Sequence, residues 1–192
     1  MIKILALCGS SRRGSLNQKL LDEASRGVRS VGAEVTQLRL LEFGLPIYDP
    51  DWEAEYGLPQ GAQALKDLVA RHQGLLIATP EYNGGYTPLL KNALDWMSRP
   101  DGFASVRVAA LVSASPGLLG GVKSQLALQI VLGKLGMCVI PESFALGAAH
   151  HAFDERDYLK DANVAKQVRR VGAALALAVG KLTASDQADL VA

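Results

Sequence analysis

The stretch Ile4-Leu-Ala-Leu-Cys8, followed by Gly9-Ser-Ser-Arg-Arg-Gly14-Ser15, decides the fold class. A short, continuous apolar run is typical of a strand buried on both faces, and the glycines after it indicate a turn. Apolar residues then recur with helical spacing at Leu16, Leu20, Ala24 and Val28. This segment therefore predicts a strand, a glycine-bounded turn and a helix.

The rest of the chain repeats this alternation. Strands are predicted at residues 35–40, 75–79, 106–112 and 137–140, and helices at 62–72, 90–97, 122–135 and 158–182. Thr87 and Pro88 predict the N-cap and the first position of one helix. Residues 41–60 are rich in proline and aromatic side chains and are predicted to form a long loop. Apolar strands that alternate with helices predict an α/β fold with a parallel sheet covered on both faces.

Composition narrows the class of protein. The chain has 192 residues, 20 Lys+Arg and 19 Asp+Glu, for a formal net charge of +1. This suits a single domain over residues 1–192 and argues against a broadly basic nucleic-acid binder. Apolar runs are too short for a membrane span or a signal peptide, so we expect no membrane partner and a cytoplasmic location. Cys8 and Cys138 form no CxxC pair, which disfavours a structural zinc site.

Ligands of such sheets bind beyond the carboxyl ends of the strands, so the loops after the first, third and fourth predicted strands are the candidates. The first loop offers backbone N–H groups at a helix N-terminus, the side chains of Ser10, Ser15 and Asn17, and the charge of Arg12 or Arg13. These groups can surround a phosphate. Ser15 with Gln18 also fits a capping box, so a solvated turn with a good helix cap stays open as an alternative.

Rival motifs are incomplete in this loop. Gly9 and Gly14 have the spacing of a P-loop, but Ser15-Leu16 stands where Lys-Ser/Thr would be required. The loop also lacks the G-x-G-x-x-G pattern of a dinucleotide site, and the chain lacks the G-x-S-x-G elbow of a hydrolase. An NTPase, a dinucleotide lying on this turn and a Ser/His/Asp hydrolase are therefore not predicted.

The other two loops suit a planar ring. Tyr82 and Asn83 follow a buried strand, where an aromatic face and an amide can meet a heterocycle, and Gly84 and Gly85 allow the backbone to approach it closely. The loop at residues 113–117 can offer hydroxyl and amide groups to the far edge of the same ring.

Three segments carry a resemblance to a known family: Gly9-Ser-Ser-Arg-Arg-Gly-Ser-Leu-Asn17, Pro80-Glu-Tyr-Asn-Gly84 and Leu90-Lys-Asn-Ala-Leu-Asp-Trp-Met-Ser-Arg-Pro100. Together they resemble the NADPH-dependent FMN reductase family, which includes chromate, quinone and azo-dye reductases. The likeness extends from Ile4 to about Phe144. It implies a flavodoxin-like three-layer sandwich with a five-stranded parallel sheet in the order 2-1-3-4-5. It also implies non-covalent FMN, NADPH or NADH as co-substrate, and a homodimer or homotetramer.

The resemblance also assigns residues. It places the FMN phosphate on Ser10, Arg12, Ser15, Leu16 and Asn17. It places the isoalloxazine ring on Pro80, Glu81, Tyr82, Asn83 and Gly84, with Ser115 and Gly117 near the pyrimidine edge. The implied reaction is hydride transfer from NAD(P)H through FMN to a small-molecule acceptor such as a flavin, quinone, azo dye or chromate. No side chain is expected to act as a catalytic acid or base.

The alternative function is a flavodoxin-type electron carrier that exchanges electrons with protein partners. Such carriers usually use a strongly acidic surface to steer encounter, and a net charge of +1 argues against one. The small residues at 83–85 would also leave room for a nicotinamide to stack on the flavin.

The remaining candidates receive structural interpretations. Cys8 is expected to pack in the core, because burial in apolar surroundings disfavours a reactive thiolate. No metal site is expected at the histidines, since the adjacent His150 and His151 cannot share a helix face and His72 lies on a separate predicted helix. Trp96 and Met97 are expected in the core or an interface, and Arg169-Arg170 on a solvated helix face.

Overall fold

The computed structural model describes residues 1–100 and 102–189. Its strands are β1 (Lys3–Cys8), β2 (Glu34–Arg39), β3 (Gly74–Ala78), β4 (Val108–Ala114), β5 (Cys138–Val139) and β6 (Phe144–Leu146). Its α-helices are α1 (Leu16–Ser30), α2 (Pro50–Tyr56), α3 (Gln60–Ala70), α4 (Pro88–Met97), α5 (Val122–Lys134) and α6 (Ala162–Asp189). Two 3₁₀ turns, η1 (Leu40–Phe43) and η2 (Ala149–His151), complete the described part of the chain.

The sheet has the predicted parallel order β2-β1-β3-β4-β5. The expectation of one fifth strand at 137–140 was incomplete, because two short strands share the edge beside β4. Val108 pairs with Cys138 in β5, whereas Val112 pairs with Phe144 in β6. Pro141 lies between the two strands and has no N–H to donate to a ladder, which accounts for the break.

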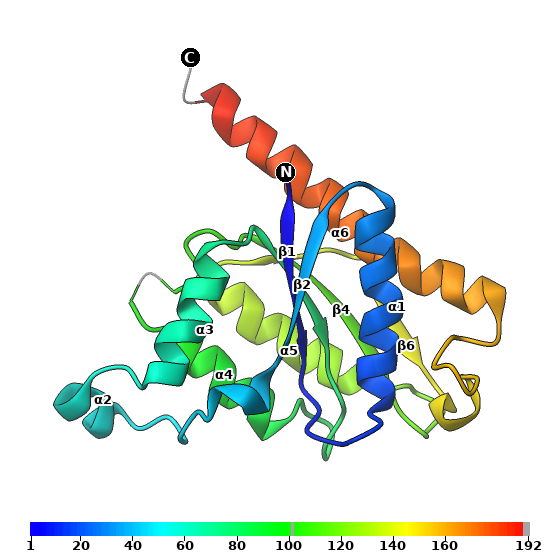
Figure 1. The fold of residues 1–192 in the computed structure, drawn as a ribbon, viewed down its shortest axis with the longest axis horizontal. Helices are drawn as coiled ribbons and strands as arrows, with labels where there is room; N and C mark the ends of the chain where they lie inside the picture. Colours follow the sequence, from blue (N-terminus) through cyan, green and yellow to red (C-terminus); the bar gives the residue numbers. More distant parts are fainter. Residues whose placement is uncertain (101, 190–192) are drawn as a thin grey trace.

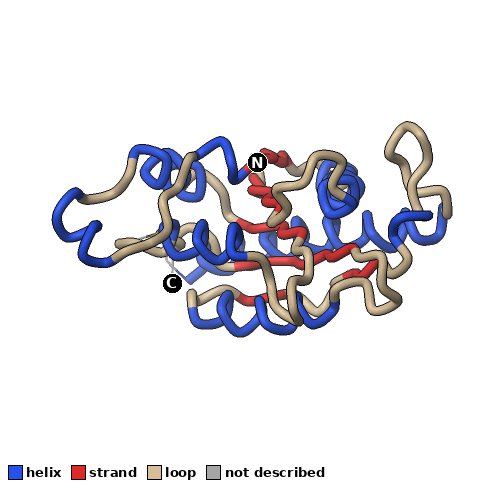
Figure 2. Tube along the Cα trace, turned by 90° about the horizontal axis from the view of Figure 1, so that it is seen from below, coloured by secondary structure: helices blue, strands red, loops and turns tan. Residues whose placement is uncertain are grey.

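The sheet is covered by helices on both faces, as the three-layer prediction required (Figure 1). Alternate residues of β1 divide between two cores: Ile4, Ala6 and Cys8 pack toward α1 and α6, whereas Leu5 and Leu7 pack toward α3, α4 and α5. Figure 2 shows the strands between these two helical layers. The continuous apolar run in the sequence thus reflects burial on both faces.

Helices α1 and α6 pack backbone to backbone. A Cβ atom at Gly27 would lie 1.8 Å from the carbonyl oxygen of Arg169, and one at Gly172 would lie 2.0 Å from that of Ala24. Arg169 lies on an exposed helix face, as predicted, and it also pairs with Glu23, a carboxylate that is only 1% exposed. The buried charge needs a partner, and the close helix contact supplies one.

The segment at 41–60 is not the long loop that was predicted. It contains η1 and the helix α2, which begins at Pro50 and is capped by Asp49 through bonds from the N–H groups of Asp51 and Trp52. A side-chain cap followed by proline is a helix-start signal, and the density of prolines in the sequence obscured it.

The remaining boundaries shift by a few residues. Helix α4 begins at Pro88 with Thr87 as its N-cap, as predicted. The final helix begins at Ala162, four residues later than expected, because Asp161 accepts bonds from the N–H groups of Asn163 and Val164. Across the described residues, no helix combines the length and the apolarity that crossing a membrane would require.

Candidate functional site

A cavity of about 340 Å³ lies at the carboxyl ends of β1, β3 and β4, and we call it the strand-end cavity. It is lined by Ser10, Arg12, Gly14, Ser15, Leu16, Asn17, Pro80, Glu81, Tyr82, Ala114, Ser115, Pro116 and His150. Most of the predicted site residues therefore line this one cavity. Asn83, Gly84 and Gly117 lie beside this wall and are not part of it.

The β1–α1 loop forms one end of the cavity. The hydroxyl oxygen of Ser15 accepts a bond from the N–H of Gln18 and caps α1. The N–H groups of Leu16 and Asn17, in the first turn of α1, have no partner within the helix by virtue of their position. The expected capping box is only half formed, since the Gln18 side chain bonds to Asp22 instead.

The side chain of Asn17 clamps the loop to the sheet. Its Nδ2 donates to the carbonyl oxygen of Ala114 over 2.8 Å, and its Oδ1 accepts from the N–H of Ala114 over 2.9 Å. Both polar ends of this buried side chain are thus engaged. The backbone N–H of Asn17 lies in the first turn of α1 and can meet a ligand, and the side chain fixes where that N–H points.

A second clamp joins the same loop to α4. The hydroxyl of Thr87 donates to the carbonyl oxygen of Gly9 over 2.6 Å while its oxygen caps the N–H of Leu90. A Cβ atom at position 9 would lie 3.1 Å from the Thr87 hydroxyl, so glycine allows this approach. The loops after β1 and β3 therefore hold each other in place.

The loop after β3 makes a tight turn. Tyr82 and Gly85 exchange two backbone bonds of 2.9 and 3.0 Å around Asn83 and Gly84, whose φ angles are 52° and 81°. Asn-Gly is the preferred pair for a turn with two positive φ angles. The Tyr82 side chain is 46% exposed, so its ring is available to a ligand. Glu81 is anchored, because its carboxylate accepts from the N–H of Lys123 in the first turn of α5.

The opposite rim is built by a segment to which sequence reasoning assigned no role. The N–H of Ser115 donates to Leu146, and the N–H of Ala149 donates back to Ser115. This places His150, in η2, at the cavity wall. His150, Gly14, Ala114 and Pro116 were missed as lining residues. From the sequence, His150 was weighed only as a possible metal ligand. No motif connects it with the loop at 113–117.

The electrostatics of the site are simple. Arg12 brings a positive charge to the end where α1 begins, and helix N-termini favour anions. Burial raises the pKa of the Cys8 thiol, which supports the expected packing role. Among the described residues there is no group of three or more His, Cys, Asp or Glu side chains that could hold a metal ion.

The sequence model of the family described as NADPH-dependent FMN reductase matches residues 2–151. The chain belongs to this family. An NAD(P)H-dependent FMN reductase of Pseudomonas aeruginosa is 34% identical over 184 residues, covering 94% of this chain and 97% of the relative. An NAD(P)H:quinone oxidoreductase of Solanum tuberosum is 35% identical and covers 91% of each chain.

Solved structures support the same assignment. FerB, a flavoenzyme NAD(P)H:(acceptor) oxidoreductase from Paracoccus denitrificans, superposes with a TM-score of 0.78 at 29% identity and covers 94% of this chain and 98% of its own. An azoreductase from Bacillus anthracis shares the fold with a TM-score of 0.60 at 14% identity, covering 92% of this chain and 99% of its own. The flavodoxin-like prediction is therefore confirmed.

The strand-end cavity of this FMN reductase family member has the donor set that FMN requires. One end gathers backbone N–H groups, hydroxyls and a guanidinium, which suit a phosphate. Another part of the wall offers the exposed Tyr82 ring and the side chain of Ser115, which suit a planar ring.

Proposed function

We propose that the chain is an FMN-dependent NAD(P)H oxidoreductase that reduces small-molecule acceptors. The observation that carries this proposal is the strand-end cavity, in which Arg12 and the N-terminus of α1 lie at one end and Tyr82 and Ser115 line other parts of the wall. A phosphate and a ring of one ligand can occupy the two parts together. The quinone and FMN reductases among the relatives make quinones and flavins the first acceptors to examine, followed by azo dyes and chromate.

Each residue has a separate task in this proposal. Ser10, Arg12 and Ser15, with the backbone N–H groups of Leu16 and Asn17, bind the phosphate. Pro80, Glu81, Tyr82, Asn83 and Gly84 shape the edge that receives the ring, and Ser115 and Gly117 meet its pyrimidine edge. Bound FMN supplies the hydride-accepting chemistry, and the protein supplies binding and orientation.

The protein side chains then need only to position the reactants. The turn at Asn83-Gly84-Gly85 carries small side chains and lies outside the cavity wall, which leaves an approach for a nicotinamide over the ring. None of the proposed site residues acts as an acid or base in this mechanism. NADPH and NADH are both donors in the proposal, and the cytoplasm is its proposed location.

We also propose that the working species is a homodimer or homotetramer. In helix α4, Leu90, Leu94, Trp96 and Met97 are fully buried within the monomer, so these side chains are not available to a partner subunit. Four exposed apolar side chains instead lie just before α5 and along it: Leu118 (90%), Leu119 (64%), Leu126 (57%) and Ile130 (77%). This surface adjoins the loop at Ser115, so a partner subunit would border the ring.

Steady-state turnover of purified protein loaded with FMN tests the function. NADPH and NADH should each be oxidised with a panel of quinones, free flavins, azo dyes and chromate, and turnover should disappear when FMN is removed. Turnover that requires an added protein partner would favour the electron-carrier alternative. Light scattering tests the assembly, and a mass near 20.4 kDa for the fully active species would contradict the oligomer.

A further inference from the structure

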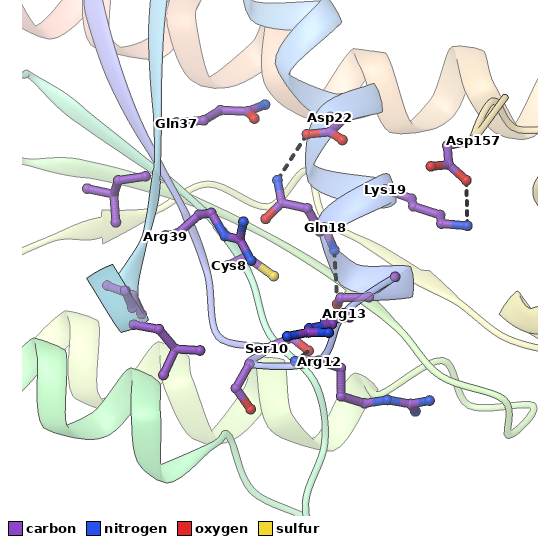
Figure 3. Close-up of a pocket in the computed structure, with 16 residues that line it drawn as sticks. Cys8, Ser10, Arg12, Arg13, Gln18, Lys19, Asp22, Gln37, Arg39 and Asp157 are labelled. Atoms are coloured by element: carbon purple, nitrogen blue, oxygen red, sulfur yellow. Dashed lines mark hydrogen bonds and ion pairs between the residues drawn. The ribbon is translucent and has the colours of Figure 1, made fainter. Parts of the chain in front are cut away.

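A second cavity, of about 520 Å³, lies on the other side of the β1–α1 loop, between α1 and the end of β2. We call it the basic cavity, because its wall includes Arg12, Arg13, Lys19 and Arg39 against two carboxylates, Asp22 and Asp157. In Figure 3, Arg39 reaches from β2 toward Cys8 and the loop, whereas Arg12 extends away from Arg39.

The carboxylates of this cavity already have partners. Asp157 pairs with Lys19 over 2.5 Å, and Asp22 accepts a bond of 3.0 Å from the Gln18 side chain. Arg39 lies 3.7 Å from Glu42 in a pair whose side chains are about 70% exposed, a contact that water weakens strongly. In residues 1–100 and 102–189, Arg13 forms no ion pair. Two guanidinium groups are therefore available to an anion.

The strand-end cavity does not use these two groups. The cavities share Ser10, Arg12, Gly14 and Ser15, so the β1–α1 loop is the wall between them. Arg12 lines both cavities, while Arg13 and Arg39 line only the basic one. The single phosphate of FMN would be matched by Arg12, the hydroxyls and the helix N-terminus. Arg13 and Arg39 are thus suited to a different phosphate close to the first.

The apolar side of the basic cavity narrows the choice of ligand. Leu38 and Leu40 are buried there, and Leu41 is 55% exposed. A site that combines guanidinium groups with an exposed leucine suits a nucleoside phosphate better than a free ion, because the base can pack on the apolar surface. NADPH carries such a group, the 2′-phosphorylated adenosine at the end opposite its nicotinamide. NADH lacks this phosphate.

We propose that the basic cavity binds the 2′-phosphoadenosine end of NADPH, with Arg13 and Arg39 as the phosphate ligands. This rests on the proposed function and adds a preference for NADPH over NADH. An arginine beside the ribose 2′ position is the usual means by which α/β dinucleotide sites accept this phosphate. Here the site lies at the end of β2 and leaves the strand-end cavity to the flavin.

Calorimetric titration of the FMN-loaded protein tests the site without turnover. The probes are 2′,5′-ADP, 5′-AMP and inorganic phosphate, and 2′,5′-ADP should bind at least tenfold more tightly than either of the others. Equal binding of 2′,5′-ADP and 5′-AMP would overturn the role of the 2′-phosphate. Phosphate binding as tight as that of 2′,5′-ADP would overturn the role of the adenosine.

Substitutions then locate the site. Arg39→Ala and Arg13→Ala should each weaken 2′,5′-ADP about tenfold to a hundredfold, as expected for the loss of a charge-assisted bond. They should raise the KM ratio of NADPH to NADH by at least tenfold, and Arg39→Lys should recover part of the loss. Arg71→Ala, at an exposed arginine after α3, is the matched control and should leave both values unchanged. Unchanged 2′,5′-ADP affinity in both alanine variants would overturn the assignment.

The outcomes separate this inference from the proposed function. Protein that binds FMN and oxidises both nucleotides with equal KM values refutes the basic cavity as a phosphate site but leaves the reductase in place. Protein that binds 2′,5′-ADP as expected but neither holds FMN nor oxidises NADPH refutes the reductase and leaves the cavity assignment in place.

Discussion

The two cavities on either side of the β1–α1 loop are built differently. The strand-end cavity is held by short clamps to backbone atoms: Asn17 on Ala114, Thr87 on Gly9 and Glu81 on Lys123. The basic cavity is walled largely by long side chains, and Arg39 keeps 70% of its side chain exposed. A preorganised wall suits a cofactor that remains bound, whereas exposed guanidinium groups suit a co-substrate that must leave.

The largest expected effect concerns the clamp at Asn17. Asn17→Ala leaves the N–H and the carbonyl of buried Ala114 without partners, so the free energy of unfolding should fall by about 2–4 kcal/mol. FMN affinity should fall as well, because the loop loses its anchor. Urea denaturation with and without FMN measures both effects.

Asn163→Ala is the matched control, since this exposed asparagine lies in the first turn of α6. It should change stability by less than about 0.5 kcal/mol. If both variants are equally stable, the strand-end cavity is not held by this clamp and the contrast between the two cavities is lost.

The next effect separates the two neighbouring arginines. Arg12→Ala should weaken FMN about tenfold to a hundredfold and riboflavin far less, because only FMN carries the phosphate that Arg12 meets. Arg13→Ala, the matched control, should change both affinities little, since Arg13 lines only the basic cavity. Fluorescence titration measures all four affinities. Equal losses for FMN and riboflavin in Arg12→Ala would mean that Arg12 only shapes the loop.

A smaller effect is expected at the turn after β3. Gly84→Ala places a side chain at a φ of 81° and should cost about 1–2 kcal/mol of stability. Gly133→Ala is the control, because a Cβ there meets nothing within 4 Å and replaces a glycine inside α5, so stability should rise by about 0.5–1 kcal/mol. Thermal unfolding measures both changes in stability, which should be a loss for Gly84→Ala and a gain for Gly133→Ala. A neutral Gly84→Ala would show that the turn is not constrained.

The smallest effect concerns the floor of the basic cavity. Burial raises the pKa of Cys8, so its thiol stays neutral at pH 7 and should react with iodoacetamide much more slowly than exposed Cys138. Because the folded-state pKa is above the unfolded value of about 8.5, the contribution of Cys8 to stability is complete below that pH and declines as pH rises through the folded value. Mass spectrometry of alkylated peptides from pH 7 to 9 measures the rates. Faster labelling of Cys8 would contradict its burial.

The sequence predicted the strand-end cavity far better than the basic one. Apolar strands, the Thr87-Pro88 start of α4 and the loops at 10–17 and 80–84 are local patterns, and each predicts its structure without knowledge of the rest. The partners of Asn17 and Arg169 lie far away in the chain, so no local pattern indicates the clamp on Ala114 or the pair with Glu23.

Local patterns also gave no sign of the part of the strand-end cavity wall that contains His150. His150 reaches the cavity only because β6 pairs with the upper half of β4 and brings the following residues against Ser115. The basic cavity likewise depends on the end of β2 lying beside the β1–α1 loop, and Arg39 belongs to no motif. The spacing of apolar residues along the chain predicts the helices and strands. The positions of His150 and Arg39 at the cavities depend instead on how strands distant in the sequence pair.

Anaerobic mixing of the FMN-loaded protein with NADPH tests the central claim most directly. The flavin absorbance near its visible maximum should be lost on adding one equivalent of NADPH per bound flavin, with no other protein present. A flavin that stays oxidised in excess NADPH and NADH, but is reduced once a separate reductase is added, would contradict the account and identify an electron carrier instead.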